Sequence, residues 1–69
     1  MAMKSFVLRT AKDSDSLKSK GQVIVWCCPR AMPQRNEKVL VDGFVCLCVD
    51  IKPNLPDALM WAWVARRDA

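Results

Sequence analysis

The pair Asp42-Gly43, which stands between two alternating apolar runs, constrains the fold more than any other feature of the chain. The flanking residues 38–41 and 44–51 are rich in β-branched side chains. A two-residue hairpin turn needs positive φ angles at its central positions, and Asp-Gly adopts them readily. We therefore predict a β-hairpin over residues 38–51.

The second strand of this hairpin presents two different sets of side chains. Val45, Leu47, Val49 and Ile51 alternate with Phe44, Cys46, Cys48 and Asp50. Alternate residues of a strand point to opposite faces of the sheet. We expect the aliphatic set to meet the core. The other set is more apolar than a solvated face requires, so we expect it to meet a partner or a second copy.

The first half of the chain predicts two more strands. Residues 4–10 alternate as one strand, and residues 11–20 are polar with a single apolar anchor at Leu17, which favours a loop over one helical turn capped by Asp13 or Ser14. Residues 21–28 are apolar on both faces, which is typical of a strand covered on both sides. Pro29 ends this strand and opens a surface loop over residues 29–37.

The C-terminal segment allows two interpretations. Asn54 is a good N-cap, Pro56 suits a first turn, Asp57 suits the positive end of the helix dipole, and Arg66 and Arg67 suit the negative end. These signals favour a helix over residues 55–67.

A period of two favours a strand instead. Leu59, Trp61 and Trp63 repeat as they would on one face of a strand paired with residues 44–51. On a helix Trp61 and Trp63 would point about 200° apart, so only one of them could face the sheet.

Residues 21–28, Gly-Gln-Val-Ile-Val-Trp-Cys-Cys, resemble a strand in the small SH3-like barrel of plasmid-encoded dihydrofolate reductases. The likeness covers these eight residues, and the short substrate-contacting strand motif of that family is not found here. The resemblance therefore implies no function.

Together these elements predict a single α+β domain over residues 1–69. We expect a small antiparallel meander of three or four strands, with the C-terminal helix packed on one face through Leu59 and one tryptophan. The alternative is an all-β small barrel of the SH3-like or OB-like kind. Hydrophobic residues make up 52% of the 69-residue chain, more than a monomer of this size readily buries. We therefore expect a homodimer.

Composition excludes several classes of chemistry. The chain has no histidine, so Cys-His and Ser-His-Asp machinery cannot be built, and its two glycines form no phosphate loop. Its four cysteines lie in Cys27-Cys28 and Cys46-x-Cys48, and neither pair has the spacing of a zinc knuckle. We expect free, packed thiols, no metal and no cofactor. The alternative is a disulfide from Cys27 or Cys28 to Cys46 or Cys48, or between subunits.

No apolar run approaches the roughly 20 residues of a membrane span, and residues 1–9 do not have the apolar core of a signal peptide. We therefore expect a cytoplasmic protein that does not enter a membrane.

Aromatic and basic residues are the candidates for recognition. Trp61 and Trp63 stand close to Arg66 and Arg67, and tryptophan and arginine are enriched in interface hot spots. Phe44 and Trp26 complete the predicted partner-binding set: Trp61, Trp63, Arg66, Arg67, Phe44 and Trp26. A second set lies in the two polar segments and would form a basic rim if they shared one edge of the sheet: Lys18, Lys20, Arg30, Arg35 and Lys38.

We therefore predict a small non-enzymatic binding protein that regulates a larger protein or complex, for example as an inhibitor or accessory modulator. The alternative is a nucleic-acid-binding module that uses the basic segments with a stacking tryptophan. The net charge of +4 arises from 11 basic and 7 acidic side chains that are interspersed, which is a weaker bias than most nucleic-acid binders show. A third hypothesis, a small oligomeric enzyme, requires an active site on a symmetry axis.

Overall fold

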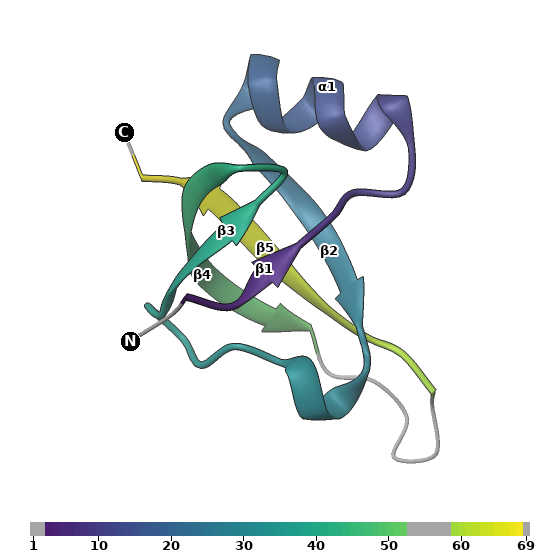
Figure 1. The fold of residues 1–69 in the computed structure, drawn as a ribbon, viewed down its shortest axis with the longest axis vertical. Helices are drawn as coiled ribbons and strands as arrows, with labels where there is room; N and C mark the ends of the chain where they lie inside the picture. Colours follow the sequence, from purple (N-terminus) through teal and green to yellow (C-terminus); the bar gives the residue numbers. More distant parts are fainter. Residues whose placement is uncertain (1–2, 53–58, 69) are drawn as a thin grey trace.

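The computed structural model describes residues 3–52 and 59–68, in which five strands form one curled sheet, a half-barrel (Figure 1). The elements in chain order are β1 (Ser5–Phe6), α1 (Ala11–Lys20), β2 (Gln22–Cys27), a 3₁₀ turn η1 (Pro29–Ala31), β3 (Lys38–Val41), β4 (Phe44–Lys52) and β5 (Trp61–Arg67). The order across the sheet is β1-β3-β4-β5-β2. β1 runs parallel to β3, and the other neighbours are antiparallel.

The predicted C-terminal helix on a three- or four-stranded meander is wrong. Residues 61–67 form β5, which lies between β4 and β2 and pairs with both. The strand places Trp61, Trp63 and Ala65 on one face, where a helix would have turned one indole away from the core. Burial of the Trp63 ring, with Trp61 half-buried on the same side, therefore outweighs the helix propensity of the segment. The predicted cap, Asn54, lies outside the described residues.

The predicted hairpin is confirmed. Asp42 (φ 49°) and Gly43 (φ 84°) form its turn, with Val41 opposite Phe44. The Asp42 carboxylate also accepts hydrogen bonds from Leu8 N (2.9 Å) and Ser14 Oγ (2.9 Å). The turn therefore joins the hairpin to the start of α1.

Residues 11–20 form a helix rather than the expected loop. Thr10 is its N-cap: the backbone is extended and Oγ1 accepts from Asp13 N at 3.1 Å. Gly21 ends the helix in the left-handed conformation (φ 75°), and its N–H donates to Leu17 O. Leu17, the expected apolar anchor, is fully buried. Ten residues hold a helical shape because one side chain enters the core and both ends are capped.

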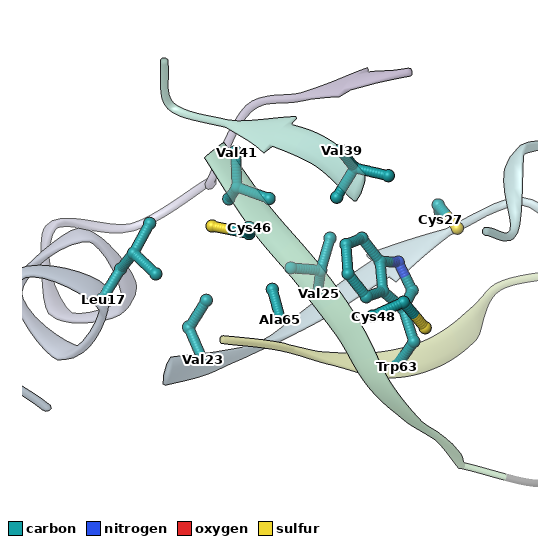
Figure 2. Close-up of a cluster of buried hydrophobic side chains, with 10 residues drawn as sticks. All are labelled: Leu17, Val23, Val25, Cys27, Val39, Val41, Cys46, Cys48, Trp63 and Ala65. Carbon is teal, nitrogen blue, oxygen red and sulfur yellow. The ribbon is translucent and has the colours of Figure 1, made fainter. Parts of the chain in front are cut away.

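The core lies on the inner, concave side of the sheet, where Trp63 is fully buried among small side chains (Figure 2). The ring of Phe6 meets it edge-on, with ring centroids 5.0 Å apart. Cys46 and Cys48 are fully buried here, whereas Val45 is 41% exposed. The expectation that Val45 and Leu47 face the core is therefore wrong.

A register shift in β4 explains why Ile51 nevertheless points inward. The pairing with β5 slips between Cys48 and Asp50, which is the signature of a β-bulge. Because the bulge adds one residue, Cys48 and Ile51 share a face although they are three positions apart. Ile51 lies opposite Trp63 and packs against the core.

β2 is confirmed as a strand, but it is covered on only one side. Val23, Val25 and Cys27 are buried, whereas Ile24 is 45% exposed and Trp26 is 52% exposed. α1 lies beside β2 through contacts on the covered side (Figure 1). Among the described residues no helix is long and apolar enough to span a membrane.

Candidate functional site

The outer face is the side of the sheet that points away from the core. The pairing register of the strands shows which residues lie on this face, because directly paired residues point to the same side of the sheet. The side chains on this face are Ser5 of β1, Lys38 and Leu40 of β3, Val45, Leu47, Asp50 and Lys52 of β4, Ala62, Val64 and Arg66 of β5, and Gln22, Ile24 and Trp26 of β2. The face thus draws on all five strands.

Two apolar clusters lie at opposite corners of the outer face. The first contains Leu40, Val45 and Leu47, with Leu40 paired to Val45 across β3 and β4.

The second apolar cluster is built from β2 and β5. Ile24 pairs with Val64, and Trp26 pairs with Ala62. Ala62 is buried although it lies on the outer face, as expected for a small side chain between Trp26 and Lys52. Exposed fractions near one half for Ile24 and Trp26 are high for residues of this size in a sheet. The second cluster is therefore the more accessible one.

A polar row separates most of the first cluster from the second. It contains Lys38, Arg66 and Gln22, and Leu47 of the first cluster lies in it between Lys38 and Arg66. Lys38 Nζ lies 3.4 Å from Asp68 Oδ2, and Asp50 Oδ1 lies 3.5 Å from the Arg35 guanidinium. Among the described residues, neither Arg66 nor Lys52 has a carboxylate within ion-pair distance.

Two open grooves lie at the margins of the outer face. One, of about 330 Å³, runs from Asp13 and Ser16 of α1 across Ile24 and Val64 to Lys52.

The other groove, of about 410 Å³, lies at the hairpin turn. It is lined by Gly43, Phe44, Val45, Arg67 and Asp68. The Arg67 guanidinium lies 5.6 Å from the centroid of the Phe44 ring, within the range of a cation–π contact. Both grooves are shallow and combine apolar walls with charged rims, as a protein interface does.

The six residues predicted to bind a partner are dispersed by the structure. Trp63 is in the core and Trp61 is half-buried on the same inner side. Trp26 and Arg66 lie on the outer face, and Phe44 and Arg67 line the groove at the hairpin turn. The structure adds outer-face residues that the sequence did not single out for binding: Ile24, Leu40, Val45, Leu47, Lys52 and Val64. The alternation of Ile24 with Val23 and Val25 was the sequence signal that places Ile24 on the opposite face of β2 from these two valines.

The basic residues predicted for nucleic acid do not share one edge. Lys18 and Lys20 lie in the last turn of α1, and Arg30 lies in η1, at the opposite end of the sheet (Figure 1). Arg35 and Lys38 are engaged in the ion pairs with Asp50 and Asp68. The two polar segments therefore form no common rim.

The four cysteines are free thiols in this structure, three of them buried and Cys28 exposed. Burial raises the pKa of Cys27, Cys46 and Cys48 above the ordinary value of a thiol. The indole Nε1–H of Trp63 is buried without a hydrogen bond of ordinary geometry and lies toward Cys27 (Figure 2), where it offsets part of the rise in the pKa of that thiol. No cluster of three or more metal-ligating side chains occurs within residues 3–52 and 59–68.

Comparison of the chain with protein-family models, with curated proteins and with solved structures found no significant match.

Proposed function

We propose that this chain is a small non-enzymatic binding protein that covers part of another protein through its outer face. One observation carries the proposal: Ile24, Trp26 and Val45 are each more than 40% exposed on the same face of one sheet. Large apolar side chains that gather on one face of a small domain mark an interaction surface.

Trp26 is the proposed anchor. Tryptophan is among the residues most enriched in interface hot spots, because it buries a large rigid surface at little cost in side-chain entropy. Ile24 and Val64 flank it along β2 and β5. Truncation of a hot-spot residue costs at least about 2 kcal/mol of binding free energy, so this position should dominate the affinity.

The outer face is the convex side of the half-barrel (Figure 1). A standard interface takes about 800 Å² from each partner, so a protein partner of ordinary size would contact side chains from several strands of this face.

The test is affinity capture from a lysate of the organism that encodes the chain, followed by mass spectrometry. Wild type is compared with Trp26→Ser and with Ile24→Ser. Leu59→Ser is the matched control, since Leu59 is an apolar side chain, 87% exposed, outside the outer face.

We expect one enriched protein that is lost with both outer-face variants and retained with the control. Far-ultraviolet circular dichroism verifies that all variants are folded. Equal capture by wild type and Trp26→Ser would rule out the outer face as the binding surface.

A further inference from the structure

We infer that the partner presents carboxylate side chains between two apolar anchors. This inference rests on the proposed function and goes further, because it specifies the chemistry of the bound surface. It follows from how charge is distributed over the outer face.

The outer face carries an uncompensated positive charge. Its strand positions hold three cations, Lys38, Lys52 and Arg66, and one carboxylate, Asp50. Asp50 is paired with Arg35, and Lys38 is paired with Asp68. Lys52 and Arg66 are left without a carboxylate among the described residues, so a bound surface would have to supply one.

The two uncompensated cations lie where a partner must cross. Arg66 stands in the polar row between the two apolar clusters, and Lys52 closes the groove over Ile24 and Val64. A segment that contacts both clusters therefore passes over Arg66. Burying that guanidinium without a counter-charge would be costly, whereas a carboxylate can form a bidentate pair with it.

The spacing between strands and the rise per residue determine how far apart the two apolar anchors lie. Val45 and Ile24 are separated by two strand spacings and by two steps along the strand direction. With about 4.8 Å between strands and about 6.8 Å per two residues, the path along the curved sheet between these two residues is roughly 15–17 Å. The carboxylates should lie between two apolar anchors that far apart.

The same charges argue against a second copy at this face. Two outer faces packed together would place uncompensated cations against each other, and like charges in an interface oppose association. Nucleic acid also fits less well, because its affinity depends on many phosphate contacts and only two free cations lie on this face.

The test is selection of a random 16-residue peptide library, displayed on phage, against the immobilised wild-type chain. Selected peptides are synthesised and titrated by calorimetry. We expect Asp or Glu to be enriched between apolar anchors, and binding to be lost with Trp26→Ser. The double charge reversal R66E/K52E should weaken binding about tenfold.

Two comparisons isolate the charge effect. K18E/K20E makes the same change in net charge on α1, away from the outer face, and should alter the dissociation constant by less than about twofold. A peptide with Lys in place of its Glu or Asp should regain affinity for R66E/K52E. This rescue would not occur if the double variant were merely misfolded.

The other outcomes separate this inference from the proposed function. Peptides that need Trp26 but show no acidic bias would overturn the inference alone. A selection that yields no Trp26-dependent peptide would overturn both. Binding of a 20-nucleotide oligothymidylate that depends on Arg66, or a dimer in sedimentation equilibrium that Trp26→Ser dissociates, would replace the acidic partner with nucleic acid or with a second copy.

Discussion

At the scale of single residues, the core works because one large ring is surrounded by small side chains. Trp63 is completely buried in a cluster that also contains Cys46, Cys48 and Ala65. Cysteine acts here as a small hydrophobe.

Replacing one buried thiol by a hydroxyl tests this role. Cys46→Ser should lower the free energy of unfolding by about 1–3 kcal/mol, because the hydroxyl is buried without an assured partner. Urea unfolding monitored by tryptophan fluorescence measures the change. Cys28→Ser is the control and should be nearly neutral, since Cys28 is exposed. Equal effects of the two substitutions would contradict the packing role of Cys46.

At the scale of secondary-structure elements, the hairpin turn also holds the start of the helix through hydrogen bonds. Asp42 holds the positive φ that the turn requires, and its two carboxylate oxygens bind Leu8 N and Ser14 Oγ. α1 places only Leu17 fully in the core, so these bonds supply much of its remaining attachment. One substitution in the turn should therefore weaken the attachment of both β1 and α1.

Asp42→Gly removes the carboxylate and keeps the positive φ accessible. We expect the free energy of unfolding to fall by about 1–2 kcal/mol, the contribution of two exposed hydrogen bonds to a charged group. Ser14→Ala should lower it by less. In the Asp42→Gly background, Ser14→Ala should have almost no further effect, and the double-mutant cycle measured by urea unfolding reports this coupling. Additive losses would show that the two side chains do not interact.

At the scale of the whole molecule, burial couples stability to alkaline pH. Burial raises the pKa of Cys27, Cys46 and Cys48 above the ordinary value of 9.0. Near that pH the unfolded chain releases its thiol protons while the folded chain retains them. Stability is therefore fully present below about pH 8.5 and decreases as the pH rises through 9 toward the raised values.

Urea unfolding at pH 7.5 and at pH 10 should show this loss. The difference in the free energy of unfolding between the two pH values should shrink when Cys46 and Cys48 are both replaced by alanine. That variant starts from a lower stability, because removing each buried sulfur atom leaves a small cavity. An unchanged difference would attribute the alkaline loss to groups other than these thiols.

Several local features could be predicted from the sequence because neighbouring residues determine them. Asp42-Gly43 needs only its own backbone preferences to form a turn, and Leu17 is the sole apolar residue between Ala11 and Gly21. The strand β2 was recognisable from its run of β-branched residues. Of the outer face, only Trp26 and Arg66 were proposed as partner-binding residues, since both types are common in interfaces.

Besides the type of element at residues 11–20 and 61–67, the errors concern which side of a strand faces inward. For residues 44–51 both alternating sets are apolar, so local pattern could not separate core from surface. The bulge between Cys48 and Asp50 then reversed, partway along β4, which of the alternating residues face inward. A single-residue shift reverses every side chain beyond it, and such a shift depends on the partner strand.

The sequence by itself determined the hairpin turn at Asp42-Gly43, because a two-residue turn depends on the backbone preferences of adjacent residues. Only the tertiary structure decided that residues 61–67 pair as a strand between β4 and β2, and that Cys46 and Cys48 rather than Val45 and Leu47 face the core. These choices rest on contacts between residues far apart in the chain. Burial of Trp63 outweighed the local preference for a helix, and the same choice left Ile24, Trp26 and Val45 on the open face of the sheet.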